Sequence, residues 1–234
     1  MAAPKFQFAK NRPVLDQLEA MYGETRIYEA DLRMDALLGQ SSEYNFSVLA
    51  PDNNIQAQVT PNENRLNKAD SFVATHHAIM IWKVAATVPT QAQFASTILR
   101  TFPNPLVFTA GGQALALESL YVNGFIQLLV DDNKYQNQYS LQRFRRVPQS
   151  QEGVGSTAVS NAAVQRDQYD LESTPYVQLM RPIIFNGSSK IDLSVNLNTS
   201  INMAGTSSQN YISILYRGYL VSGANTIGVG TNKQ

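Results

Sequence analysis

Apolar and polar residues alternate along much of the chain, which is the pattern of β-strands with one buried face. The clearest alternation covers residues 191–198, where every second side chain is apolar. A turn signal at 186–188, with the sequence Asn-Gly-Ser, separates it from an apolar run at 177–185. We expect these two runs to form a β-hairpin with one buried and one polar face.

Three further stretches also favour strands. Tyr44, Phe46 and Val48 alternate with polar residues, and the turn residues at 50–54 precede apolar positions at 55–59. This predicts a strand, a turn and a strand. The run at 211–221 closes the set of strands.

Two runs are apolar on both faces, so periodicity alone does not separate a buried strand from a helix. Residues 71–84 are rich in β-branched and aromatic side chains, and we expect a long central strand there. Residues 114–130 open like a helical turn, yet Asn123-Gly124 lies between two apolar runs, which favours two β segments. The Pro-rich residues 102–105 predict a corner.

The amino-terminal region differs from the rest. Pro13 in a first turn, apolar residues at helical spacing and Gly23 as a stop predict a short amphipathic helix at about 13–22. Residues 26–34 alternate and favour a strand, although a helix remains an alternative over 26–38.

These segments divide the chain into three parts. We expect an N-terminal arm at 1–40, a β-sandwich at 41–222 with a long surface loop at 148–168, and a flexible C-terminal tail at 223–234. About eight strands at short spacing, without alternating helices, predict an all-β fold. The expected architecture is an antiparallel β-sandwich of jelly-roll type.

The composition adds a statement about the surface. Asn and Gln together number 38, against 18 Lys and Arg and 18 Asp and Glu, with a formal net charge of zero. Such a chain lacks the repulsion that keeps copies apart, and amides form contacts without the cost of burying a charge. The surface therefore suits contacts with other copies, although a soluble β-domain with a polar surface is an alternative.

The charge distribution argues against nucleic acid as a main partner. The one basic cluster is Arg143, Arg145 and Arg146, of which the first two would share a face of a strand. We favour a solvated cluster or a subunit contact over a contact with phosphate or genome.

Targeting and redox signals are sparse. No stretch approaches the roughly 20 apolar residues of a membrane helix, and residues 1–12 carry no apolar run of the kind found in signal peptides. We therefore expect synthesis and use without export. The absence of cysteine excludes disulfides and thiolate metal sites.

Few residues are candidates for catalysis. His76 and His77 are adjacent, so on a strand they point to opposite faces and do not form one site. A jelly-roll hydrolase would need two carboxylates, but the candidates resemble turn residues and exposed acids; they are Glu118, Asp131, Asp132 and Asp192. No phosphate-binding glycine loop is present, and we expect no cofactor and no small-molecule ligand.

Aromatic residues suggest a second class of function, a carbohydrate-binding module or adhesin head. Exposed rings could stack on sugars, although Trp82 lies in an apolar run and favours core packing. The other candidate rings are Tyr121, Tyr135, Tyr139, Tyr169 and Tyr176.

Four segments together resemble the small jelly-roll structural proteins of bacterial viruses over about residues 40–222. They are RLNKADSF at 65–72, NPLVF at 104–108, LESLYVNG at 117–124 and IDLSV at 191–195. The resemblance implies a non-enzymatic capsid or head protein that self-assembles in a virion, with arm and tail reaching across neighbouring copies. Its partners would be copies of itself and other virion proteins. The expected interface residues are Phe6, Phe8, Arg12, Arg143, Arg145 and Arg146.

Overall fold

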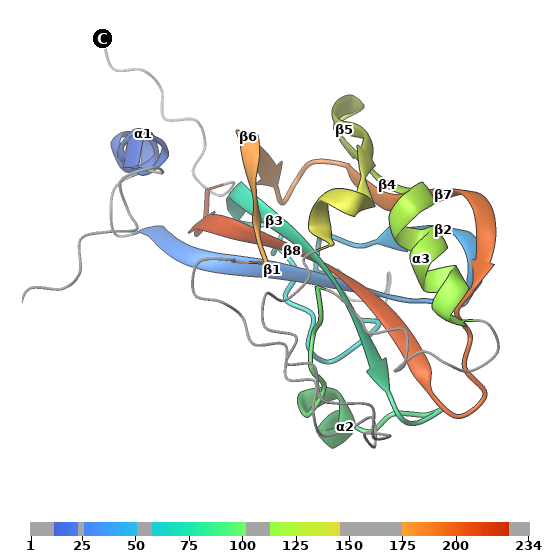
Figure 1. The fold of residues 1–234 in the computed structure, drawn as a ribbon. Helices are drawn as coiled ribbons and strands as arrows, with labels where there is room; N and C mark the ends of the chain where they lie inside the picture. The colour runs from blue at the N-terminus through green and yellow to red at the C-terminus, as the bar shows by residue number, and fades with distance from the viewer. Residues whose placement is uncertain (1–11, 23–25, 51–57, 102–112, 146–174, 225–234) are drawn as a thin grey trace, which may run out of the picture.

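The structure is a computed structural model that describes residues 12–22, 26–50, 58–101, 113–145 and 175–224. It confirms the predicted all-β sandwich, in which two four-stranded antiparallel sheets face each other (Figure 1). Sheet A has the strand order β1-β8-β3-β6, and sheet B has the order β2-β7-β4-β5. The strands are β1 (Ile27–Leu37), β2 (Gln40–Phe46), β3 (Ser71–Val84), β4 (Gly124–Val130), β5 (Asn133–Ser140), β6 (Val177–Asn186), β7 (Ile191–Asn202) and β8 (Gln209–Val221).

The strand pairings are nested. The first strand pairs with the last, β2 with β7, β3 with β6 and β4 with β5, all antiparallel. The pairs β3–β8 and β4–β7 then join these ladders into two sheets. The first half of the strands is thus laid against the second half in reverse order.

The main core lies between the sheets, because alternate side chains of each strand point inward. Residues from both sheets are fully or almost fully buried there, including Phe72, Ile79, Ile126, Leu128, Val195, Ile212, Ile214 and Tyr216. The predicted long central strand at 71–84 is confirmed as β3, and the predicted strand at 211–221 is confirmed as part of β8. Their inward faces pack in the main core and parts of their outward faces are covered by α1 and α2, which explains why both strands are apolar on both faces.

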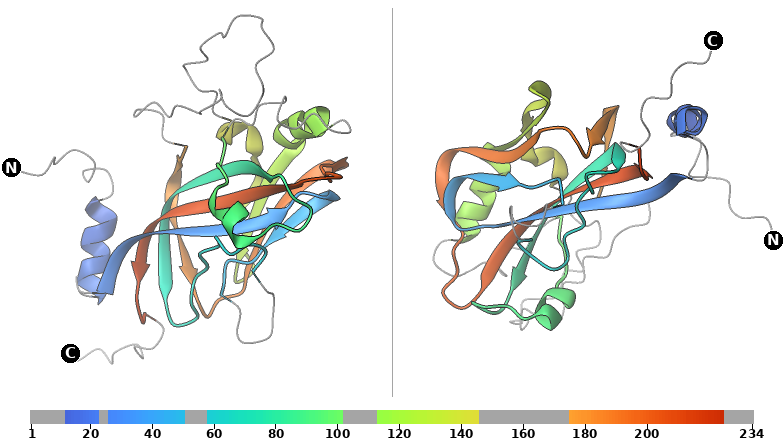
Figure 2. Two further views of the ribbon diagram at one scale, coloured as in Figure 1. Left: turned by 90° about the horizontal axis from the view of Figure 1, so that it is seen from below. Right: turned by 180° about the vertical axis from the view of Figure 1, so that it is seen from behind.

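Helix α1 (Arg12–Tyr22) confirms the predicted N-terminal helix. Figure 2 shows it at the end of sheet A where β1 begins. Its buried residue Leu18 packs with Val73, Tyr219 and Val221 on the outward face of this sheet. The helix therefore covers apolar positions that β3 and β8 would otherwise expose.

Residues 27–37 form a strand, which decides between the two structures that the sequence left open. The strand pairs with β8 along its whole length, from Ile27 opposite Val221 to Leu37 opposite Tyr211. Although this segment was assigned to the arm at 1–40, it is an edge strand of the sandwich. Among the described helices and strands, α1 alone precedes the first strand of the sandwich.

The predicted hairpin at 177–198 is wrong in its pairing, although both strands are present. β6 pairs with β3 in sheet A, whereas β7 pairs with β2 and β4 in sheet B. The turn at 186–190 therefore crosses from one sheet to the other. Gly187 allows this crossing, because a Cβ there would lie 2.3 Å from the carbonyl oxygen of Asn67.

The predicted pair of β segments at 114–130 is wrong in its first half. Residues Gln113–Asn123 form helix α3, and only Gly124–Val130 is a strand. Leu117, Leu120 and Tyr121 recur at helical spacing and are buried in the main core. The Asn123-Gly124 signal marks the change from helix to strand, where a Cβ on Gly124 would lie 2.2 Å from the Leu120 carbonyl oxygen.

Two short helices complete the described elements. They are α2 (Gln91–Ala95) and the 3₁₀ helix η4 (Leu141–Phe144). The predicted strand at 44–48 corresponds to β2, but Val59 of the predicted strand at 55–59 is not in a strand, and 51–57 lie outside the described residues. The predicted corner at 102–105, the loop at 148–168 and most of the tail at 223–234 also lie outside them.

Candidate functional site

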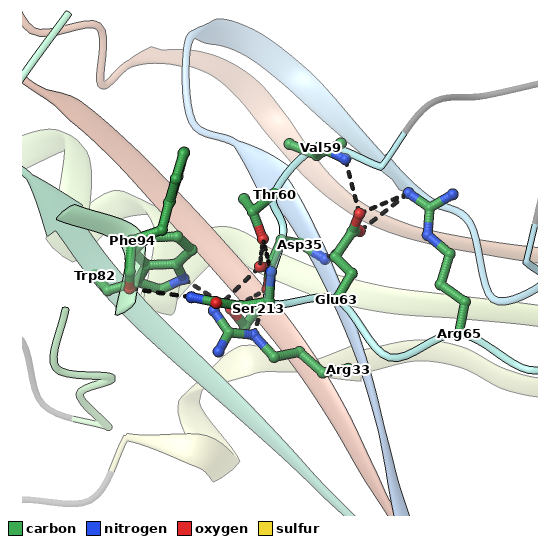
Figure 3. Close-up of polar contacts among 10 residues, drawn as sticks. Arg33, Asp35, Val59, Thr60, Glu63, Arg65, Trp82, Phe94 and Ser213 are labelled. Carbon is green, nitrogen blue, oxygen red and sulfur yellow. Dashed lines mark hydrogen bonds and ion pairs between the residues drawn. The ribbon is translucent and has the colours of Figure 1, made fainter. Parts of the chain in front are cut away.

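The most elaborate polar arrangement in the described residues lies on the outward face of sheet A (Figure 3). Strand alternation places Asp35 of β1 beside its cross-strand partner Ser213 of β8. The segment at 58–66, between β2 and β3, runs over this position and brings in Thr60 and Glu63. The side chains of Asp35 and Glu63 are both fully buried, with 0% exposure.

Asp35 is surrounded by four side-chain hydrogen bonds. Arg33 donates from Nε to Oδ1 at 2.9 Å and from Nη2 to Oδ2 at 3.1 Å. Ser213 donates to Oδ1 and Thr60 donates to Oδ2, both at 2.5 Å. The carboxylate is therefore charge-paired and saturated with donors, which is what burial of a charge requires.

Glu63 is satisfied in the same way. Its Oε1 accepts from the Asp35 amide at 2.9 Å, and its Oε2 accepts from the Val59 amide at 2.7 Å. Arg65 Nη2 lies 3.0 Å from Oε1 and 2.9 Å from Oε2, and donates to both. We call Arg33, Asp35, Thr60, Glu63, Arg65 and Ser213 the buried ion network.

The network continues into an aromatic group. Trp82 Nε1 donates to Ser213 Oγ at 2.7 Å, and its ring stacks on Tyr211 with centroids 4.4 Å apart. Phe94 of α2 packs edge-on against both rings. Trp82 is fully buried, so its predicted role in the core is confirmed.

The buried ion network is an anchor rather than a reaction centre. A general acid or base needs an oxygen that a substrate can reach, and every oxygen of the two carboxylates already accepts hydrogen bonds from protein groups. What it does is attach the segment at 58–66 to β1. Backbone bonds of 2.9 Å in both directions between Arg33 and Asn64 complete that attachment.

This network was not predicted from the sequence. Asp35 continues the alternate polar positions of Asp31 and Arg33, and Glu63 lies among polar residues, so nothing in the local pattern marks either carboxylate as buried. Alternation places Asp35 on the face of β1 opposite the main core. Whether a separate segment covers that face depends on the tertiary fold.

The two histidines point to opposite faces of β3, as predicted. His76 Nδ1 lies 2.9 Å from Thr75 Oγ1, and its pKa is lowered by partial burial and by the nearby Arg217. His77 is fully buried between the sheets against Tyr139, Phe144 and Tyr216. Burial, with a smaller effect of His76, lowers its pKa to about 3.

Three of the four candidate carboxylates lie at one end of the sandwich. Asp131 Oδ1 accepts from the Lys190 amide at 2.9 Å and its Oδ2 accepts from Ser189 Oγ at 2.6 Å, while its own amide donates to the Lys190 carbonyl. Lys190 Nζ lies 3.9 Å from Asp132 and 3.1 Å from Asp192.

This group does not form a protected catalytic pair. The side chains of Asp132 and Asp192 are 88% and 55% exposed, and the lysine lies between them. Glu118, the fourth candidate, is exposed on α3. Asp131 lies in the turn that the sequence predicted, but its carboxylate accepts hydrogen bonds from the distant β6–β7 connection rather than from local donors.

The predicted interface residues are only partly within the described region. Arg143 belongs to η4 and Arg145 caps it, so they do not share the face of a strand as expected. The Arg143 guanidinium lies over the Tyr139 ring, with its Cζ 4.9 Å from the centroid. Phe6, Phe8 and Arg146 lie outside the described residues, and Arg12 is the first residue of α1.

Most of the candidate sugar-stacking rings are buried or lie against an arginine side chain. Trp82 and Tyr121 are buried. Arginine guanidinium groups lie over the rings of Tyr135, Tyr139 and Tyr176, at 4.1–5.1 Å from Cζ to centroid. Tyr169 lies outside the described residues. The alternative of a carbohydrate-binding module thus finds little support among the rings that the structure describes.

Two further features are missing from the described part of the chain. Within it, no three His, Asp or Glu residues come together in a way that would hold a metal ion. None of its helices has the length and apolar character needed to cross a membrane.

Comparison with known proteins assigns neither a family nor a function to the chain. The chain matches no protein-family model, no curated protein and no solved structure.

Proposed function

We propose that the chain is a non-enzymatic structural protein of a bacteriophage particle, and that it acts by binding copies of itself through broad polar surfaces. The observation that carries the proposal is the nested pairing of the eight strands. Pairing of β1 to β4 with β8 to β5 in reverse order, followed by closure into two sheets, is the arrangement expected of a jelly roll. Viral capsid proteins are one of the protein classes built on that fold.

The fold by itself does not give a function, since jelly rolls also serve as lectins and as enzymes. The site geometry supports the structural role over those two. Both buried carboxylates of the network are saturated, and His77 has a strongly lowered pKa inside the core. Of the candidate sugar-binding rings that the structure describes, Trp82 and Tyr121 are buried, and Tyr135, Tyr139 and Tyr176 lie against arginine.

The residues exposed on the outward faces of the two sheets also support the proposal. The outward face of sheet B carries amide, hydroxyl and apolar groups of intermediate exposure, among them Phe125, Gln127, Ser194 and Asn196. On the outward face of sheet A, by contrast, apolar side chains are buried beneath α1 and α2. A broad face with few charges is suited to contact with another protein surface.

Light scattering of the purified protein over a wide concentration range tests the proposal. We expect large, regular assemblies above a threshold concentration, visible as uniform particles or sheets in negative-stain electron microscopy. A protein that stays monomeric to millimolar concentration, alone and with other virion proteins, would contradict it.

The N-terminal region offers a second test. Deletion of residues 1–22 should leave a folded monomer that no longer assembles, because the arm and α1 are removed together. Deletion of residues 1–11 is the matched control, since it keeps Leu18 over Val73 and Tyr219. Assembly of the longer deletion at wild-type efficiency would exclude a role for this region.

A further inference from the structure

The zero net charge of the chain conceals a separation of charge between two sides of the sandwich. One side is formed by the edge strands β5 and β6 together with η4. These elements and Arg145 contain four basic residues and no acidic residue. We call this the basic side; its four cations, all exposed, are Lys134, Arg143, Arg145 and Arg181.

The basic side is continuous across the two sheets. Arg181 of β6 lies over the ring of Tyr135 of β5, with 5.1 Å between Cζ and the ring centroid. Arg143 of η4 lies over Tyr139 of the same strand. These contacts hold the guanidinium groups in place while leaving them exposed. The neighbouring helix α3 adds one carboxylate, Glu118.

The opposite side has the opposite charge. It is formed by the edge strands β1 and β2, which contain four acidic residues and one basic residue. Arg33 is used internally by Asp35, and Asp31 is paired with Arg217 of β8. Glu29 and Glu43 are exposed, one on each edge strand. We call this the acidic side; Arg26 lies just before it in the chain.

The two sides can meet only between different copies, because β1 and β6 are the opposite edges of sheet A, and β2 and β5 are the opposite edges of sheet B. A contact that joins different surfaces of two copies repeats from copy to copy and closes into a ring or continues as a filament. Opposite charges on the two surfaces favour that alignment and disfavour the contact of like sides.

The edges themselves argue for contact through side chains rather than through a continued β-ladder. The edge of β1 that does not face β8 is paired at Arg33 with the backbone of Asn64. β6 contains Pro182 beside a register shift, and β5 contains Gln138 at φ 52° with two register shifts. Such features prevent edge-to-edge strand addition.

We propose that neighbouring copies associate side by side, with the basic side of one copy against the acidic side of the next. The inference rests on the proposed self-assembly and names its partner surface. Guanidinium groups of Arg143 and Arg181 then face Glu29 and Glu43 of the neighbour. The exposed apolar residues Met180 and Ile184 of β6 add area to the contact.

Charge reversal on each side tests this contact. The variants are R143E/R181E on the basic side and E29K/E43K on the acidic side. Each alone presents two like-charged sides, so we expect its assembly threshold to rise by about tenfold or more. An equimolar mixture of the two variants should assemble near the wild-type threshold, because each reversed side then meets a side of opposite charge.

Two control variants accompany the charge reversals, and three results would contradict the inference or the function on which it rests. Q91K and Q91E change the charge at an exposed position of α2, which packs on the central strands β3 and β8 away from both sides, and should leave the threshold unchanged. Reversal variants that assemble like wild type would overturn the inference while leaving self-assembly intact. Loss of single-stranded RNA or DNA binding by R143E/R181E, without loss of assembly, would instead assign the basic side to nucleic acid and overturn it. A wild-type protein that never assembles would overturn the proposed function itself.

Discussion

His77 is a polar residue enclosed by aromatic rings in the interior of the sandwich. Gln136 Nε2 lies 3.2 Å from its Nδ1 and donates to it, while Tyr216 donates to the Oε1 of the same amide at 3.5 Å. The ring is neutral at physiological pH, because its pKa is lowered to about 3. An uncharged imidazole can therefore pack as an aromatic residue does.

The depressed pKa makes stability depend on pH. Below pH 6.5 the unfolded chain binds a proton at His77 and the folded chain does not, so stability present above that pH is lost as the pH falls toward 3. We expect the unfolding free energy from urea titrations to fall between pH 6.5 and 5, by at most about 1.4 kcal/mol per pH unit. His77→Phe should remove most of this slope, and His76→Gln a smaller part. An unchanged slope in His77→Phe would refute the assignment.

Asp131 and Asp132 form the two-residue turn between β4 and β5, and both have positive φ angles, 49° and 65°. Glycine accepts this geometry more readily than aspartate, especially at the second turn position. Asp132→Gly should therefore raise the unfolding free energy by up to about 1 kcal/mol. Asp131→Gly is the matched control: it should lower stability, because it removes the acceptor of Ser189 Oγ and the Lys190 amide. Equal effects of the two substitutions in thermal melts would contradict this account.

Prediction from sequence at this scale succeeded where geometry is local. The opposite faces of His76 and His77 follow from the period of a strand, and the turn role of Asp131 follows from its residue type. The burial of Asp35 and Glu63 was not predictable, because it depends on a segment that crosses β1 from elsewhere in the chain.

Among the elements, the segment at 58–66 has the strongest polar attachment. Its Glu63 is buried with Arg65, and loss of one partner leaves a charge buried without compensation. Glu63→Gln should lower the unfolding free energy by about 3–5 kcal/mol in chemical denaturation. Asp31→Asn, which breaks the half-exposed pair with Arg217, should change it by less than about 1 kcal/mol. Similar losses in both variants would contradict an anchoring role for the network.

The pattern of the sequence predicted strands better than it predicted their partners. Alternation at 191–198 gave the strand and its buried face correctly, yet it contains no information about whether β6 is the neighbour. The connection at 186–190 is short enough for a hairpin, but its glycine packs against the backbone of Asn67 and carries the chain into the other sheet. Helix α3 was missed because its run of apolar residues suits either structure.

At the scale of the whole molecule, the sandwich class followed from the number of strands and the lack of alternating helices. The separation of charge did not follow, because Arg181 is far from Lys134 and Arg143 in the sequence and joins them only at one side of the fold. The net charge of the chain is zero, whereas its described edge strands place basic and acidic residues on opposite sides of the sandwich.

The charged sides predict a response to salt. Added salt shortens the range of electrostatic attraction, to about 3 Å at 1 M. We therefore expect the assembly threshold to rise as NaCl is increased from 0.05 to 0.5 M, as measured by light scattering at constant pH. Assembly that strengthens steadily with salt would indicate an apolar contact in place of the charged one.

The pairing of the first strand with the last also has a consequence for how the protein is made. Because Ile27 pairs with Val221, sheet A is completed only after residue 221 has left the ribosome. Topologies with such distant partners fold slowly, on a scale of about milliseconds to seconds. The nascent chain therefore spends the synthesis of β2 to β7 with β1 still unpaired. Under the proposed assembly, each copy would have to close its own sheets before its two sides could meet a neighbour.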